Sequence, residues 1–264
     1  MSKKLANLLF PSIDKTPSYY EDFFPERNLP DGAKVTRLGP SPTGFMHLGN
    51  LYGAFVDERL AHQSNGVFYL RIEDTDDKRY VEGAVDTIIK SLDYFGIHFD
   101  EGATKDGDVG EYGSYTQSER KEIYQTYAKE LVRNGFAYPC FLTEDDIDKI
   151  RAHQEAQKLT PGVYGDFATS RKLSFEDIEK KIKAGEQWVL RLASGGDCSQ
   201  RTDIVRKIRV NDAIRGRLEM PENYHDVVIL KTTGIPTYHF AHVIDDHLMR
   251  TTHVVRGAEW LPSL

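Results

Sequence analysis

The feature that most constrains the fold is a strand–turn–helix–strand pattern between residues 34 and 72. Val35 to Leu38 is predicted to be a short buried strand, and a turn rich in Pro, Ser and Gly follows at residues 39–44. Apolar residues then recur every three or four positions until Asn65-Gly66, where a helix is expected to end. Val67 to Ile72 is a second β-rich run. Such a unit places its strands parallel with a right-handed crossover, so we predict an α/β sheet. The expected core-facing positions of the helix are Leu48, Leu51, Tyr52, Phe55, Val56 and Leu60.

The middle of the chain has a different pattern. Amphipathic helices are expected at residues 85–95 and 123–132. Short strands and charged helices follow at residues 136–226, with capping-box-like starts at Thr143 and Ser174. We interpret this stretch as an inserted domain.

The α/β sheet is expected to resume after the insertion. Residues 227–230 and 253–256 both have buried-strand character, and residues 240–248 between them have helical periodicity. The expected helix face consists of Phe240, Val243, Ile244, His247 and Leu248.

Composition excludes several classes of protein. Of the 264 residues, 39% are hydrophobic and 28% are charged, which is typical of a folded globular chain. The net charge of −7 disfavours nucleic-acid binding over the whole surface but allows a local basic groove. No apolar run approaches the ~20 residues that span a bilayer, so we predict a cytoplasmic protein with no membrane association. Cys140 and Cys198 have neither a CxxC pairing nor clustered His residues, which predicts two buried thiols, no disulfide framework and no structural zinc.

The densest chemical signal is RLGPSPTGFMHLGN at residues 37–50, between the expected strand and helix. A helix N-terminus offers unpaired N–H groups and roughly half a positive charge, so it suits the phosphates of a nucleotide. His47 is expected to donate a hydrogen bond to phosphate, and Gly49 would let an adenosine ring approach the backbone closely. An isolated His-x-Gly would more often mark a helix cap.

The full string resembles the HIGH motif of class I aminoacyl-tRNA synthetases. Its Pro-Ser-Pro-Thr-Gly segment is the form typical of glutamyl-tRNA synthetases, whereas glutaminyl enzymes usually have Pro-Glu-Pro-Asn-Gly. Motifs that resemble the same family follow in order as LRIEDTD at 70–76, QSER at 117–120, PTYHFA at 236–241, DDHLM at 245–249 and VVRGAEW at 254–260.

The resemblance implies a Rossmann-like catalytic domain with an inserted α+β domain that binds the tRNA acceptor end. The implied organisation is an N-terminal extension at 1–33, the first half of the catalytic domain at 34–112, the insertion at 113–227 and the second half of the catalytic domain at 228–264.

Site residues follow from the matching motif positions. Glu73 would bind the α-amino group of glutamate, since it follows a strand at the carboxyl edge where open sheets bind ligands. Arg37 and Arg256 are the candidates for the γ-carboxylate, because a guanidinium can bind both of its oxygens. The remaining glutamate positions are Ser41, Tyr238 and His242, the implied catalytic positions are His47, Gly49 and Asn50, and the ATP positions are Gly44, His47, Gly49, Glu259 and Trp260.

Several of these residues have alternative interpretations or depart from the family pattern. Glu-Asp-Thr-Asp alone would more often be an acidic loop, and a metal site at Asp74 and Asp76 is a less favoured alternative. His242 stands where related enzymes often have Asn, Asn50 occupies the last position of the HIGH motif, and Ala258 replaces a frequent acidic residue.

The resemblance implies glutamate, ATP with Mg²⁺, and tRNA as partners. A basic run in the insertion is either a phosphate contact or a salt-bridged hairpin face. This run consists of Arg201, Arg206, Lys207, Arg209, Arg215 and Arg217, interrupted by Asp203 and Asp212.

The predicted reaction is formation of glutamyl adenylate and transfer of glutamate to tRNA, by a protein that is a monomer when intact. Because the chain ends four residues after Trp260, before any KMSKS-type loop or anticodon-binding domain, the 264-residue form is expected to be inactive. Two alternatives stay open: an enzyme that glutamylates queuosine in tRNA, or a non-catalytic module that binds ATP, glutamate or tRNA.

Overall fold

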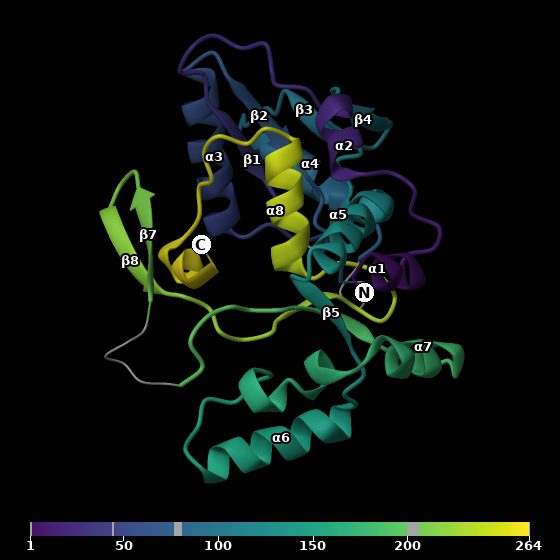
Figure 1. The fold of residues 1–264 in the computed structure, drawn as a ribbon. Coiled ribbons are helices and arrows are strands. Elements are labelled where there is room, and N and C mark those ends of the chain that lie inside the picture. Colours follow the sequence, from purple (N-terminus) through teal and green to yellow (C-terminus); the bar gives the residue numbers. More distant parts are fainter. Residues whose placement is uncertain (1, 44, 77–80, 200–205, 264) are drawn as a thin grey trace. The chain divides into compact units, whose positions relative to one another are not determined.

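The computed structural model describes residues 2–43, 45–76, 81–199 and 206–263 (Figure 1). It divides the chain into two compact units. Unit 1 comprises residues 1–14, 125–237 and 261–264, and unit 2 comprises residues 15–124 and 238–260. The domain limits inferred from the resemblance stay predictions.

Unit 2 contains the parallel sheet that the sequence predicts. β1 (Val35–Leu38) pairs in parallel with β2 (Val67–Leu70), and β2 pairs in parallel with β3 (Glu101–Thr104). β4 (Gly107–Val109) adds an antiparallel edge strand. All four residues of β1 are buried, including the polar Thr36 and the charged Arg37, whose side chains hydrogen-bond to the Asp57 carbonyl and to Asp246. The helices of this unit are α2 (Pro17–Phe23), α3 (Leu48–His62), α4 (Ala84–Tyr94), the start of α5 (Lys121–Arg133) and α8 (Tyr238–Leu248).

The face that α3 buries differs from the prediction. Leu48 is 79% exposed and Tyr52 is 69% exposed, and Phe55 also faces solvent. The buried positions are Ala54, Asp57, Glu58 and Ala61, which follow the same three- and four-residue spacing on another side of the helix. Small side chains at 54 and 61 suit close packing of α3 on the sheet, where Figure 1 shows it beside β1 and β2.

The C-terminal part of unit 2 also differs from the prediction. Residues 253–256 form no strand, because Thr252 and His253 both donate their N–H groups to one carbonyl, that of Val35, and no ladder continues from there. On α8, Val243 and His247 are exposed, while Ala241, His242 and Asp245 are buried beside the expected Ile244 and Leu248.

Unit 1 has a separate three-stranded antiparallel sheet in the order β5 (Ala137–Cys140), β6 (Val189–Leu192) and β9 (Val228–Leu230). The strand expected at 227–230 therefore forms, but it pairs with β6 instead of resuming the parallel sheet. β7 (Lys207–Asp212) and β8 (Gly216–Pro221) form a hairpin. The helices of this unit are α1 (Ser2–Leu9), the rest of α5, α6 (Glu144–Ala156) and α7 (Phe175–Lys183).

Local signals for the helices of unit 1 are confirmed. Thr143 and Asp146 form a reciprocal capping box at the start of α6, and the Ser174 side chain accepts from the N–H of Asp177 at the start of α7. Within the described ranges, no helix combines the length and apolar character that crossing a membrane requires.

The cysteines follow the prediction in part. Both are free thiols, and Cys140 is buried in β5. Cys198 is exposed, so the expectation that both thiols are buried is wrong. Cys198 stands between Asp197 and Ser199, which are residue types that are mostly exposed.

Candidate functional site

A cavity of about 640 Å³ lies in unit 2 where β1 ends and α3 begins. This is the edge at which open parallel sheets bind ligands. Nine of the residues singled out from the sequence line it, namely Arg37, His47, Gly49, Asn50, Glu73, Tyr238, Arg256, Glu259 and Trp260.

The other three singled-out positions have a different placement. Ser41 is exposed in the turn and does not line the cavity, and its carbonyl accepts from the N–H of Thr43. His242 is buried behind the cavity wall, where its Nδ1 lies 3.1 Å from Arg256 Nη2. Gly44 lies outside the described residues. The sequence reasoning missed Asp57, which also lines the cavity.

A buried network of charged side chains holds two residues of the cavity lining in place. Arg71, which directly follows β2, is fully buried and donates to Glu73 Oε1 at 2.9 Å and to Asp246 Oδ1 at 2.7 Å. Arg37 donates to both oxygens of Asp246, each at 3.1 Å. Burial alone would raise the pKa of Asp246, but the nearby Arg71 and Arg37 charges hold that pKa far below its ordinary value. Arg37 and Glu73 are therefore fixed in orientation before any ligand binds.

Glycine at position 39 leaves room for the Glu73 carboxylate. A Cβ atom at this position would lie 2.3 Å from Glu73 Oε1, which is closer than any real contact. The Gly in the turn thus allows the acidic side chain to lie directly over the backbone at the end of β1.

The opposite wall carries a second cation. Arg256 is half-buried, and among the described residues it has no carboxylate partner. Burial and the charge of Arg37 both lower the pKa of Arg256, because two guanidinium groups share this region without enough negative charge. Tyr238 lines the same cavity as Arg256, and its ring centroid lies 5.0 Å from that of His242 and 5.5 Å from that of Trp260. This part of the site therefore favours an anion.

His47 caps the helix that borders the cavity. Its Nδ1 accepts from the N–H of Gly49 at 3.2 Å, so the residue is a helix cap as the alternative interpretation held. The cap also determines which nitrogen of the neutral His47 ring carries the proton. With Nδ1 accepting, the neutral imidazole carries its proton on Nε2, which leaves a donor for a ligand at the positive end of α3.

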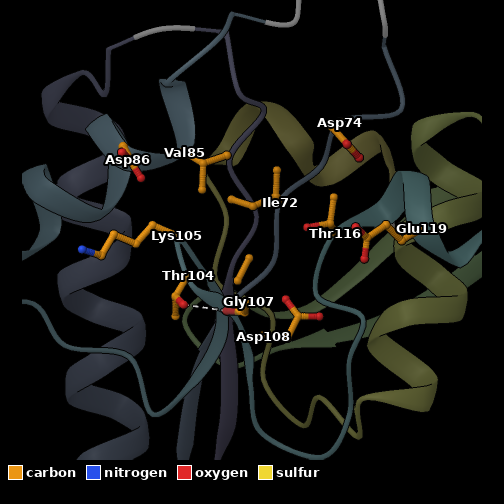
Figure 2. Close-up of a pocket in the computed structure, with 11 residues that line it drawn as sticks. Ile72, Asp74, Val85, Asp86, Thr104, Lys105, Gly107, Asp108, Thr116 and Glu119 are labelled. Atoms are coloured by element: carbon orange, nitrogen blue, oxygen red, sulfur yellow. Dashed lines mark hydrogen bonds between the residues drawn. The ribbon is translucent and has the colours of Figure 1, made fainter.

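A second pocket of about 400 Å³ in unit 2 is lined by Asp74, the residue after Glu73, and by Asp86, Asp108 and Glu119 (Figure 2). Asp74 accepts from both the N–H and the hydroxyl of Ser118, at 2.8 and 2.6 Å. Asp108 accepts from the N–H of Tyr115, and Glu119 accepts from the hydroxyl of Ser114. Across the described ranges, no group of three or more His, Cys, Asp or Glu residues has the arrangement of a metal site. Asp74 therefore acts as a structural acceptor here.

The basic run of unit 1 lies on the β7–β8 hairpin. Lys207 and Arg209 both pair with Glu219, at 3.3 and 3.2 Å, and Arg206 lies 3.6 Å from Glu222. Asp212 accepts from the backbone N–H groups of Ile214 and Arg215 in the turn. This part of the run is a salt-bridged hairpin face. Arg215 and Arg217 are exposed, whereas Arg201 and Asp203 lie outside the described residues.

Comparison with known proteins identifies the family. A model of the catalytic domain of class I tRNA synthetases for glutamate and glutamine matches residues 34–264. The chain belongs to this family. It is 61% identical over 263 residues to the glutamate–tRNA ligase of Acetivibrio thermocellus, covering 99% of this chain and 47% of that protein. Identity to the Clostridium perfringens ligase is 54% over the same length and with the same coverage of both chains.

Solved structures agree with the family's fold. The glutamate–tRNA synthetase of Elizabethkingia anophelis superposes with a TM-score of 0.77 at 38% identity, covering 88% of this chain and 46% of that one. The ligase of Elizabethkingia meningosepticum, solved in complex with its amino acid, has the same TM-score and identity, and covers 87% and 45%. The chain thus has the class I synthetase catalytic fold and spans about half the length of the curated relatives it matches.

Proposed function

We propose that this chain is the part of a glutamate–tRNA ligase that binds L-glutamate and ATP and joins them as glutamyl adenylate, from which glutamate passes to the 3′ end of tRNA. One observation carries the proposal. Arg37, Arg256 and Glu73 line a single cavity beside the N-terminus of α3. Two cations, one anion and a phosphate-binding helix end are the groups that an acidic amino acid and a nucleotide need.

The charges in the cavity match glutamate better than glutamine. Glu73 is suited to the α-ammonium group, and Arg37 and Arg256 are suited to the γ-carboxylate. Arg37 and Arg71 are hydrogen-bonded to Asp246 and Glu73, whereas Arg256 has no carboxylate partner among the described residues. A substrate with an anionic side chain supplies such a partner to Arg256, whereas a neutral amide does not.

ATP is proposed to bind at the start of α3 and along Trp260. The backbone N–H groups of the helix and His47 Nε2–H would donate to the phosphates, and the indole would cover the adenine. Mg²⁺ would accompany the nucleotide through its phosphates and water, which is the usual mode where a protein offers no cage of carboxylates.

Catalysis in this proposal depends on alignment. The α-carboxylate of glutamate would attack the α-phosphorus of ATP and expel pyrophosphate. Glu73 and the arginines would fix the amino acid for in-line attack, and the helix N-terminus and His47 would stabilise the charge that grows on the phosphates. No covalent link to the protein is needed.

Exposed Arg215 and Arg217 are the proposed contacts for tRNA phosphates. Among the described residues neither has an ion pair, in contrast to Lys207 and Arg209 on the same hairpin. Unpaired, exposed guanidinium groups are the side chains that most readily bind phosphate.

The proposed substrate can be tested by binding. We expect the 264-residue chain to bind L-glutamate more tightly than L-glutamine by about tenfold or more, because hydrogen bonds to charged groups contribute roughly 1.5–3 kcal/mol. Isothermal titration calorimetry with both amino acids, in the presence of a non-hydrolysable ATP analogue and Mg²⁺, measures this ratio. Equal affinity for the two amino acids would contradict the proposal.

Replacement of Gly49 with valine should block ATP binding. A Cβ atom added to Gly49 would lie 3.1 Å from the His47 ring. A branched side chain would therefore displace the ring and cover the helix end. A loss of about tenfold or more in ATP affinity is expected from the loss of one or two hydrogen bonds to charged phosphate. Gly195→Val is the control, since a side chain at 195 meets open space. Unchanged ATP affinity in a folded Gly49→Val protein would refute this site for ATP.

A further inference from the structure

Asp57 is a buried carboxyl group in the glutamate cavity that the charge network does not use. It lies on the buried face of α3, is 2% exposed and lines the cavity. Among the described residues its Oδ1 has no hydrogen-bond partner. Glu58, the adjacent residue, is equally buried, but its Oε1 accepts from the N–H of His98 at 2.9 Å, its Oε2 lies 3.5 Å from the Arg59 guanidinium, and it does not line the cavity. Asp57 therefore has a carboxyl oxygen that is available to hydrogen-bond to a ligand in the cavity.

The charged groups that face Asp57 explain why it stays outside the network. Arg37 approaches from β1 and Asp246 from α8, and these two are already joined by two hydrogen bonds. Burial raises the pKa of Asp57 to about 8, with Asp246 adding to this shift and Arg37 opposing it. Near pH 7 most Asp57 side chains are therefore neutral, and a neutral carboxyl group is a hydrogen-bond donor.

We propose that Asp57 is a further substrate-binding residue, whose neutral carboxyl group donates its O–H to the side-chain carboxylate of glutamate beside Arg37. The inference rests on the proposed function of the cavity. A neutral Asp57 supplies one more donor to the substrate anion and adds no second negative charge beside Arg37, which already pairs with Asp246. An ionised Asp57 would repel the same anion and compete for Arg37.

The affinity for glutamate is expected to fall as the pH rises. Glutamate binds the protein with neutral Asp57, which predominates below pH 8, so affinity is full at low pH and is lost as the pH rises through 8. Between pH 7 and pH 9 the neutral fraction falls about tenfold, and glutamate affinity should fall by the same factor. An asparagine side chain cannot ionise, so in the Asp57→Asn variant this component is missing.

The test measures glutamate affinity from pH 6 to pH 9 for the wild-type chain and Asp57→Asn, each normalised to its value at pH 7. The ratio of the two profiles removes the titration of glutamate itself. Glu58→Gln is the matched control, because it replaces a neighbouring buried carboxyl group that does not line the cavity. Its profile should follow that of the wild type. Calorimetry at pH 8 in buffers of different ionisation enthalpy should show uptake of about half a proton by the wild type and none by Asp57→Asn.

A third variant separates binding from packing. Asp57→Leu keeps the branching at Cγ but has no donor, so it should bind glutamate about tenfold or more weakly than Asp57→Asn, which retains an N–H donor. Parallel profiles for the wild type and Asp57→Asn, or equal affinities for the Asp57→Asn and Asp57→Leu variants, would overturn this inference alone. A wild-type chain that binds no glutamate at any pH would overturn the proposed function and this inference with it.

Discussion

Replacing Arg256 with alanine is expected to remove most of the affinity for glutamate and to affect ATP far less. Arg256 is the cation of the site with no carboxylate partner among the described residues, and burial together with the nearby Arg37 charge lowers its pKa. Repulsion between the two guanidinium groups is relieved when an anion binds between them. Truncating one partner of a buried charge pair costs roughly 2–5 kcal/mol, which corresponds to a loss of about 30-fold or more in glutamate affinity.

The measurement is glutamate binding by saturation-transfer NMR or calorimetry, with ATP binding followed in the same samples. Arg59→Ala is a suitable control, because Arg59 is an exposed arginine of unit 2 that does not line the cavity. Arg256→Lys should bind glutamate with intermediate affinity, since an ammonium keeps the charge but cannot bind two oxygens in a plane. If Arg256→Ala binds glutamate as well as Arg59→Ala does, the γ-carboxylate lies elsewhere.

Most residues singled out from the sequence line one cavity, because they lie at the ends of regular elements. β1 is followed by a turn rich in Pro, Ser and Gly and β2 by an acidic stretch, so the carboxyl ends of both strands could be located to within a residue or two. The side chains that follow them, Glu73 among them, line the observed cavity. Motifs far apart in the sequence could be brought together only through the resemblance, since periodicity says nothing of where Tyr238 or Arg256 lie relative to β1.

The errors have a common physical origin. Apolar periodicity identified α3 as a helix, but its buried side holds Ala54, Asp57, Glu58 and Ala61, and two of these are acids. A rule that places apolar residues inside cannot predict a helix that packs through alanines and leaves Leu48, Tyr52 and Phe55 exposed. Asp57 was missed because it is an acidic residue on the buried face of the helix.

The assignment of strands to sheets failed in a similar way. The residues of β9 are apolar and were correctly predicted as a strand, yet apolarity does not specify which sheet a strand joins. Pairing with β6 depends on the antiparallel register of residues 190 and 191 with residues 228 and 230, which is set by tertiary contacts. A short-range pattern contains no information about that partner.

The arginine–carboxylate pairs beneath the cavity explain how a polar site is held in a fixed shape. Arg71 links Glu73 to Asp246, and Asp246 in turn holds Arg37. Deeper in unit 2, Asp245 occupies the adjacent position of α8 and binds a second set of donors. Consecutive aspartates on one helix therefore have separate tasks, since Asp246 orients the residues of the cavity and Asp245 fixes α8.

Replacement of Asp245 with asparagine is expected to destabilise unit 2 by roughly 3–5 kcal/mol, because it removes the negative partner of a buried cation. Asp245 is fully buried and accepts from Arg120 Nε at 2.7 Å, from Gln117 Nε2 at 2.8 Å and from the Tyr124 hydroxyl at 2.8 Å. Arg120 is only 1% exposed, so water cannot replace the lost carboxylate. Asparagine has the same shape, but it is neutral and presents an N–H₂ group to partners that are themselves donors. Its effect should therefore arise from charge and hydrogen bonding with little change in packing.

Because the chain has two compact units, hydrogen exchange followed by mass spectrometry is the appropriate measurement, since it locates the loss of protection. Peptides containing β1, β2 and α8 should exchange faster by a factor of about 100 or more, the equivalent of 3 kcal/mol in local stability, while those of β5 and β6 should change little. Asp93→Asn, which neutralises an exposed aspartate of α4 in the same unit, is the control and should exchange like the wild type. If Asp245→Asn exchanges like this control, the carboxylate does not stabilise unit 2, and the fixed geometry of the neighbouring cavity has another cause.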